Sequence, residues 1–186
     1  AVISGGDGAD TITGGANNDS LTGGAGNDTF NIDSGTDIIT DLTTGDIVVI
    51  SNGASLNVTG ITGFVATNAS SNANASATSA NLTAASGTVT IDMSDSTGKY
   101  TITGGSGDNT LKAGKQDSVV KGESGDDIIV GDAGADTLTG GAGNDTFTGN
   151  AGNDTFNIDS GTDIINDLGG SSGSDTDILV VSSGAT

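Results

Sequence analysis

The chain has 186 residues and a formal net charge of −20, and Leu, Ile, Val and Phe together make up only about a fifth of it. This composition lies near the limit at which apolar burial no longer offsets chain entropy, so we expect a second source of stability besides a core. There are four Lys, no Arg and no Cys. A basic surface for nucleic acid, disulfides and thiolate metal sites are therefore excluded.

Membrane insertion and catalysis are also disfavoured. No apolar run approaches the 18 or so residues of a membrane span, no signal peptide is visible, and an anionic membrane would repel the chain. There is no His, and the carboxylates fall in turns, so no acid/base pair or activated nucleophile is evident. We expect no enzyme activity, no catalytic residue and no organic cofactor site.

The first fifty residues contain tandem nonapeptides. Gly5 to Thr13 (GGDGADTIT), Gly14 to Thr22 (GGANNDSLT) and Gly23 to Asn31 (GGAGNDTFN) each open with Gly and carry Asp at the sixth place and a large apolar residue at the eighth. The register begins mid-repeat at Ile3 and continues more weakly to Val49, which suggests a fragment of a longer array. The sixth-place carboxylates recur every nine residues: Asp10, Asp19, Asp28, Asp37 and Asp46. We assign residues 1–50 to a first repeat block with a degenerate flank.

Residues 51–94 form a Ser, Ala and Asn-rich insertion of β-structure or loop. Apolar alternation at Leu56 to Val58 and at Val89 to Met93 predicts strands there. For Asn68 to Ala85 three possibilities stay open: a loop, a small Ala-rich helix, or a thin continuation of the repeat.

Residues 95–168 form the second repeat block. From Asp95 to Lys121 the register holds, but its sixth places are Tyr100, Asn109 and Ser118. Four consecutive nonapeptides then run from Gly122 to Asn157. Their sixth places and the next restore the acidic series: Asp127, Asp136, Asp145, Asp154 and Asp163. Residues 169–186 are assigned to a C-terminal flank with a strand, because Asp177 to Val181 (DILVV) echoes the sequence after Asp46.

Two distant segments are nearly identical. Residues 149–168 repeat residues 23–42 with two differences, Asn150 for Gly24 and Asn166 for Thr40. The offset of 126 residues equals fourteen nonapeptides, which is consistent with one continuous solenoid and a separation of seven coils.

The nine-residue period predicts a metal site. A six-residue turn and a three-residue strand form half a coil, so the eighth residues point inward between two parallel sheets and successive turns on one edge lie 18 residues apart. Strands stack about 4.8 Å apart, and two carboxylates so close need a cation such as Ca²⁺, which accepts six to eight oxygens. The predicted bridges join Asp10 to Asp28, Asp19 to Asp37, Asp28 to Asp46, Asp127 to Asp145, Asp136 to Asp154, and Asp145 to Asp163.

We expect fewer ions around residues 95–121. The pairs Asn109 with Asp127 and Ser118 with Asp136 lack one carboxylate and should be weak or empty. All four lysines fall in this stretch, where fixed positive charge would take over part of the metal's role.

These motifs closely resemble the RTX family of calcium-binding nonapeptide repeats, G-G-x-G-x-D-x-U-x. The resemblance implies an all-β, right-handed parallel β-roll. It also implies about six full Ca²⁺ sites formed by the sixth-place Asp and by turn carbonyls, type I secretion, and folding in external calcium. The glycines implied at these turns are Gly6, Gly8, Gly24, Gly26, Gly125, Gly134, Gly143 and Gly152.

Three functions fit this resemblance. The first is a secreted structural protein of the bacterial cell surface, similar to RTX-bearing S-layer proteins, with calcium-driven self-association into a lattice or filament. In that case any cell-surface polysaccharide would be contacted through regions outside these residues. The second is the C-terminal calcium-binding secretion module of an enzyme or toxin. The third is a segment of an adhesin. The duplication and the middle segment favour the first.

Overall fold

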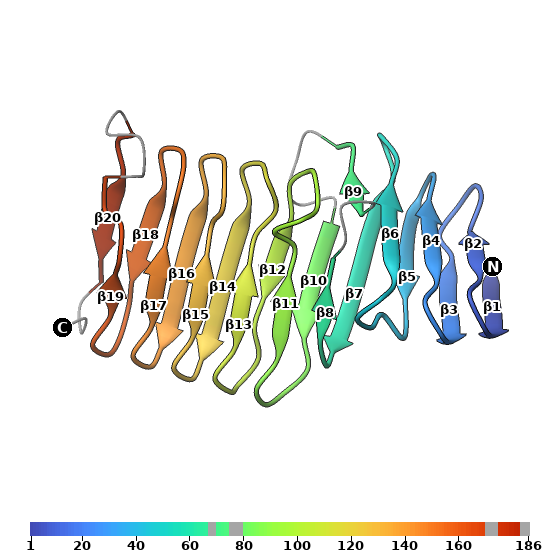
Figure 1. Ribbon diagram of the computed structural model, residues 1–186, viewed down its shortest axis with the longest axis horizontal. Coiled ribbons are helices and arrows are strands. Elements are labelled where there is room, and N and C mark those ends of the chain that lie inside the picture. The colour runs from blue at the N-terminus through green and yellow to red at the C-terminus, as the bar shows by residue number, and fades with distance from the viewer. Residues whose placement is uncertain (67–69, 75–79, 170–174, 183–186) are drawn as a thin grey trace.

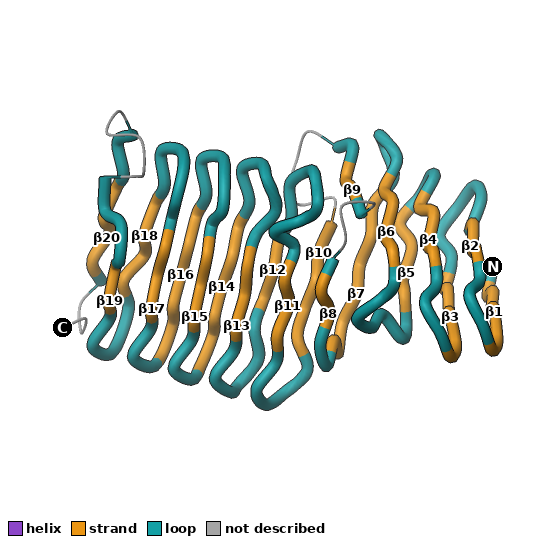
Figure 2. The backbone as a smooth tube through the Cα atoms, viewed as in Figure 1, coloured by secondary structure: helices purple, strands orange, loops and turns teal. Residues whose placement is uncertain are grey.

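The computed structural model describes residues 1–66, 70–74, 80–169 and 175–182. They form a parallel β-solenoid of about nine coils, in which short strands stack side by side along the long axis (Figure 1). The described residues contain no helix, only strands and the turns that join them (Figure 2). The predicted all-β parallel β-roll is confirmed. Nor do these residues contain a helix long and apolar enough to cross a membrane.

The first face of the solenoid is a single sheet, ten-stranded within the described residues and parallel throughout. In spatial order its strands are β1 (Val2–Asp7), β3 (Ser20–Ala25), β5 (Thr36–Ile39), β7 (Ser55–Ile61), β10 (Ala80–Ala84), β12 (Thr101–Thr103), β14 (Val119–Ser124), β16 (Thr137–Ala142), β18 (Thr155–Ile158) and β20 (Ile178–Val181).

The second face is divided into two parallel sheets. In the described part of the chain, the sheet nearer the N-terminus contains β2 (Thr11–Thr13), β4 (Thr29–Ile32), β6 (Ile47–Ile50) and β9 (Ser71–Asn72). The other contains β8 (Phe64–Val65), β11 (Thr90–Asp92), β13 (Thr110–Lys112), β15 (Ile128–Val130), β17 (Thr146–Thr148) and β19 (Ile164–Ile165). The division falls in the middle segment, where the repeat pattern is weakest.

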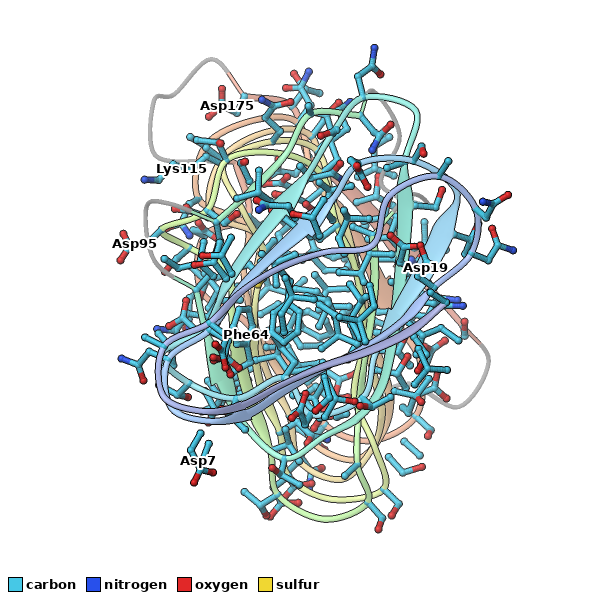
Figure 3. The ribbon with its side chains drawn as sticks, turned by 90° about the vertical axis from the view of Figure 1, so that its right-hand side faces the viewer. Asp7, Asp19, Phe64, Asp95, Lys115 and Asp175 are labelled. Atoms are coloured by element: carbon cyan, nitrogen blue, oxygen red, sulfur yellow. The ribbon has the colours of Figure 1, made fainter. Side chains whose placement is uncertain are left out.

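The apolar eighth residue of each nonapeptide forms the core, because side chains alternate along a strand and this position faces inward. Leu138 in β16 is fully buried, and Phe147 and Phe156, from opposite faces, meet edge to face with ring centroids 6.1 Å apart. Each such side chain stabilises the fold by about 1.5 to 3 kcal/mol. Figure 3, which looks along the solenoid, shows the interior filled by side chains and Asp7, Asp95 and Lys115 on the outside.

Most coils contain 18 residues, as predicted, but three coils of the middle segment are longer. On the first face Leu21 pairs with Ile39, an offset of 18. The next offsets are 19 (Ile39 to Val58), 24 (Val58 to Leu82) and 20 (Leu82 to Ile102). These three coils are therefore one, six and two residues longer than 18, which adds nine residues in all.

The nine added residues correct one sequence-based expectation. The duplicated segments are not seven coils apart but six and a half, because nine residues are half a coil. Residues 29–32 form β4 on the second face, whereas their copies, residues 155–158, form β18 on the first face. The two copies therefore lie on opposite faces of the solenoid.

The middle segment contributes strands to the same sheets as the repeat blocks. The strands predicted at Leu56 to Val58 and at Val89 to Met93 are confirmed in β7 and β11. Within Asn68 to Ala85, β9 and β10 continue the solenoid, while residues 68, 69 and 75–79 lie outside the described residues. The boundaries between the four predicted segments stay a prediction.

Candidate calcium sites

The structure brings together all six predicted pairs of sixth-place carboxylates. In each pair Oδ1 of the later Asp accepts a hydrogen bond from the backbone N–H of the earlier Asp, at 2.8 to 3.0 Å. The pairs are Asp10 with Asp28, Asp19 with Asp37, Asp28 with Asp46, Asp127 with Asp145, Asp136 with Asp154, and Asp145 with Asp163. One oxygen of each acceptor therefore holds successive coils together.

The second oxygen of most of these carboxylates is buried and has no hydrogen-bond partner. This holds for Oδ2 of Asp10, Asp19, Asp37, Asp127, Asp136, Asp145, Asp154 and Asp163. Burying a charged oxygen without a partner is costly, and an ionised carboxylate can only accept. A row of such atoms is suited to coordinating a cation.

Backbone oxygens lie beside these atoms. A Cβ placed on Gly122 would come within 2.2 Å of Asp127 Oδ2 and within 2.6 Å of the carbonyl oxygen of Gly140, one coil later. A Cβ placed on Gly5 would likewise come within 2.5 Å of Asp10 Oδ2 and within 2.7 Å of the carbonyl oxygen of Gly23. Carboxylate and carbonyl oxygens that converge without a donor between them are the ligands Ca²⁺ prefers, so the residues present fit the ion.

Backbone oxygens are needed for coordination. Among the described residues no group of three or more acidic side chains comes together as a metal site. Each step along an edge offers two carboxylates, and Ca²⁺ takes six to eight oxygens. Turn carbonyls must supply part of the remainder.

The predicted turn glycines occupy the second or fourth place of the repeat, and all have φ between +106° and +143°, which L side chains rarely adopt. They are Gly6, Gly8, Gly24, Gly26, Gly125, Gly134, Gly143 and Gly152. The turns also stack closely: a Cβ on Gly26 would lie 2.0 Å from the carbonyl oxygen of Gly8. Fourth-place carbonyls therefore face the next turn.

Burial makes ionisation of these carboxylates unfavourable. Desolvation, opposed by the N–H of Ser118 and reinforced by the charge on Asp154, raises the pKa of Asp136 to about 8. Desolvation likewise raises the pKa of Asp145 to about 6 and the pKa values of Asp37, Asp127 and Asp154. A bound cation would remove this penalty.

Asp46 and Asp177, unlike most carboxylates at the equivalent place, accept hydrogen bonds on both of their oxygens. Oδ2 of Asp46 accepts from the N–H of Thr43 at 2.8 Å and also from its hydroxyl. Asp177 accepts from the N–H groups of Asp154 at 3.0 Å and Gly169 at 2.6 Å. Asp177 thus continues the sixth-place row after a longer turn. Sequence reasoning missed it as a site residue, although its resemblance to the sequence at Asp46 was the available signal.

Sixth places without a carboxylate keep the same ladder. Asn109 Oδ1 accepts from the N–H of Val89 at 3.1 Å, and the Asn109 amide donates to the carbonyl of Gly107. Ser118 Oγ accepts from the N–H of Tyr100 at 3.2 Å and donates to the carbonyl of Gln116 at 2.7 Å. Gly107 and Gln116 hold the fourth place of their repeats. In these two turns the sixth-place side chain donates a hydrogen bond to the fourth-place carbonyl, which an ionised Asp cannot do because it has no donor.

Lysines add ion pairs in the same stretch. Lys99 Nζ lies 2.7 Å from Asp117 Oδ2, one coil away, and Lys112 Nζ lies 2.7 Å from Asp92 Oδ2. The hydrogen bond from Lys99 holds the pKa of Asp117 below its ordinary value. The proposed weakness of the sites at Asn109 and Ser118 stays a prediction.

Each duplicated segment also contains an acidic clasp, by which we mean one carboxylate that accepts hydrogen bonds from two consecutive backbone N–H groups of the preceding coil. Asp41 accepts from the N–H groups of Gly23 at 2.9 Å and Gly24 at 2.8 Å. Its copy Asp167 accepts from the N–H groups of Gly149 and Asn150 at 2.8 and 2.6 Å. The carboxylates sit at the first place of a repeat, where glycine is usual, and no spacing rule indicated this role.

Paired buried carboxylates, glycine turns and an 18-residue parallel coil define a calcium-binding β-solenoid. The family model of the RTX calcium-binding nonapeptide repeat (4 copies) matches residues 4–39, 103–138 and 130–165, just over half of the chain. The chain belongs to this family, whose repeats bind Ca²⁺. Comparisons with curated proteins and with solved structures found no match.

Proposed function

We propose that this chain is a secreted structural protein of the bacterial cell surface, in which Ca²⁺ between stacked turns drives folding and assembly after type I export. The observation that carries the proposal is the row of buried Oδ2 atoms without a hydrogen-bond partner. In the calcium-poor cytosol the carboxylates repel one another, and in calcium-rich surroundings the ion neutralises them.

About six full sites are expected, each formed by one of the six carboxylate pairs and the turn carbonyls beside it. Extracellular modules of this kind bind with dissociation constants of roughly 10⁻⁴ to 10⁻³ M, well matched to external calcium. We also propose that the chain is not an enzyme, because it has no His or Cys and its paired carboxylates are engaged in the ladder.

The S-layer-like role has its own support. The composition is rich in Ser, Thr, Ala, Asn and Gly, and a secretion module would need only one repeat block, whereas this chain has two. For self-association, β20 lies at one edge of the first-face sheet and exposes Leu179 and Val181. A second copy whose β1 continued the parallel sheet would cover these side chains.

Circular dichroism during a calcium titration of the metal-free chain tests the folding proposal. The β-signal should rise as calcium approaches millimolar levels, and Mg²⁺ at the same concentration should be far less effective, because Mg²⁺ demands octahedral geometry and dehydrates reluctantly. A β-signal that is already full in chelator would refute calcium-driven folding.

Electron microscopy and analytical ultracentrifugation test assembly. The calcium-loaded chain should form a lattice or filament, and Leu179→Asp should weaken it without changing the calcium titration. A calcium-loaded chain that stays monomeric would favour the secretion-module alternative, and a catalytic domain in the parent chain, found by mass spectrometry, would establish it.

A further inference from the structure

The net charge of −20 is unevenly distributed along the solenoid. Residues 50–121, here called the neutral segment, contain four Asp and all four Lys, so their formal charge is zero. The first acidic block, residues 1–49, has eight Asp, and the second, residues 122–186, has eleven Asp and one Glu. The neutral segment therefore lies between blocks of charge −8 and −12.

The buried polar side chains among the described residues of the neutral segment are satisfied by hydrogen bonds to the protein itself. None of their buried side-chain nitrogen or oxygen atoms lacks a hydrogen-bond partner. The side chains of Asn109 and Ser118 each accept a hydrogen bond from the preceding coil and donate one to a carbonyl of their own turn, as described above. The Tyr100 hydroxyl lies 2.5 Å from Ser96 Oγ, which donates to the carbonyl of Ser70. No cation is needed in these turns.

The neutral segment also has a core of its own. Phe64, Ile91, Tyr100 and Ile102 are at most 1% exposed, and Lys112 bridges β13 to Asp92 in β11. Strands β7, β10 and β12 stack on the first face, and β8, β11 and β13 stack on the second. Three stacked repeats are the usual minimum for a stable solenoid, and such proteins fold by nucleation in their most stable repeats and outward growth.

We infer that the neutral segment is a calcium-independent folding nucleus, from which the two acidic blocks form outward as they bind calcium. In low calcium the chain is then folded in the middle and unfolded at both sides. Calcium extends the solenoid coil by coil, because each new coil needs the preceding one as its template and needs ions for its own carboxylates. The inference rests on the proposed calcium-driven folding of the blocks.

Hydrogen–deuterium exchange of the full chain, resolved by peptide, tests it. In chelator we expect slow exchange in β7 and β10 to β13 and loss of protection in β1 to β4 and β15 to β18. Calcium should then protect the blocks. Exchange that is fast everywhere in chelator, followed by simultaneous protection in calcium, overturns the nucleus but leaves calcium-driven folding intact. Slow exchange in the blocks without calcium overturns calcium-driven folding itself.

A matched pair of variants sharpens the experiment. Ile91 and Ile129 are both fully buried inward residues of the same sheet, in β11 and β15. Ile91→Ala should abolish the protection that remains in chelator and raise the calcium concentration at which both blocks fold. Ile129→Ala should leave protection in chelator unchanged and weaken only the second block. Equal loss of chelator-state protection in both variants contradicts the inference.

Discussion

The sixth-place side chains Asn109 and Asp145 take part in the same hydrogen-bond ladder between coils, and they differ only in having an amide NH₂ group or a second carboxylate oxygen. In both, a sixth-place side-chain oxygen accepts the backbone N–H of a residue one coil earlier, Val89 for Asn109 and Asp127 for Asp145. Asn109 then offers an N–H₂ group, which donates to the carbonyl of Gly107, whereas Asp145 presents an oxygen without a hydrogen-bond partner. The ladder between coils is thus the same in both turns, and only the second terminal atom of the sixth-place side chain differs in whether it has a hydrogen-bond partner.

Close stacking of the acidic turns gives the largest expected effect. A Cβ on Gly143 would lie 2.0 Å from the carbonyl oxygen of Gly125, whereas a Cβ on Gly87, in the neutral segment and also at positive φ, would meet nothing within 4 Å. Gly143→Ala should destabilise the calcium-bound protein by about 3 kcal/mol or more, and Gly87→Ala by about 1 kcal/mol from backbone strain alone. Urea denaturation in calcium measures both. Equal losses would show that stacking at Gly143 is not tight.

Exchanging the two side chains tests the one-atom difference. Asn109→Asp should add one calcium ion to the stoichiometry measured by isothermal titration calorimetry, and it should destabilise the chelated protein, because the new carboxylate faces Asp127. Asp145→Asn should remove one or two ions, because Asp145 belongs to the pairs with Asp127 and with Asp163, and it should cost on the order of 1 to 3 kcal/mol of stability in calcium. An unchanged stoichiometry in both variants would contradict the assignment of the ion to the sixth place.

The pH dependence of the metal-free protein should separate the blocks from the neutral segment. The folded pKa values of Asp136, about 8, and Asp145, about 6, lie above the ordinary value of 3.8 for Asp, so the folded state binds more protons than the unfolded state. The contribution of these two groups to stability is therefore fully present below about pH 4. It is lost as pH rises to 6 for Asp145 and to 8 for Asp136, by at most about 1.4 kcal/mol per pH unit for each proton.

Peptide-resolved hydrogen exchange between pH 5 and pH 8, corrected for intrinsic rates, measures this trend. Protection of the second block should decline with rising pH, Asp136→Asn should flatten the decline, and saturating calcium should oppose it. An equal decline in the protection of the neutral segment with rising pH would contradict the predicted difference between this segment and the acidic blocks.

The ion pairs of the neutral segment should give the smallest effect. Lys99→Gln removes the pair with Asp117, which is half exposed, so the expected loss is about 0.5 kcal/mol and should vanish in high salt. Lys121 is an exposed lysine in β14, and Lys121→Gln is the matched control because it changes the net charge by the same amount. A loss of stability above about 2 kcal/mol in Lys99→Gln but not in Lys121→Gln would contradict this expectation, because it exceeds what an exposed ion pair contributes.

The sequence predicted the coil and the carboxylate pairs because both follow from one period. Leu138 and Phe156 face inward at place eight, and Asp136 meets Asp154 because 18 residues make one coil. Asp177 and the clasp at Asp167 were missed, since an irregular turn hides the first and the second occupies a glycine place. The opposite placement of the duplicated segments was also beyond the sequence, because the lengths of the middle coils depend on how β7 and β10 pair rather than on any motif.

The half-coil offset has a consequence for how such chains change. Consecutive nonapeptides alternate between the two edges, so the edge that a repeat occupies depends on whether an odd or an even number of repeats precedes it. Nine inserted residues that form a further half-coil exchange the edges of everything downstream, whereas nine that only lengthen existing coils leave those edges unchanged. The nine extra residues of the middle segment are of the second kind, so residues 149–168 lie six and a half coils from residues 23–42 and on the opposite edge. The edge that a repeat occupies is therefore set by the number of half-coils before it and not by its own sequence.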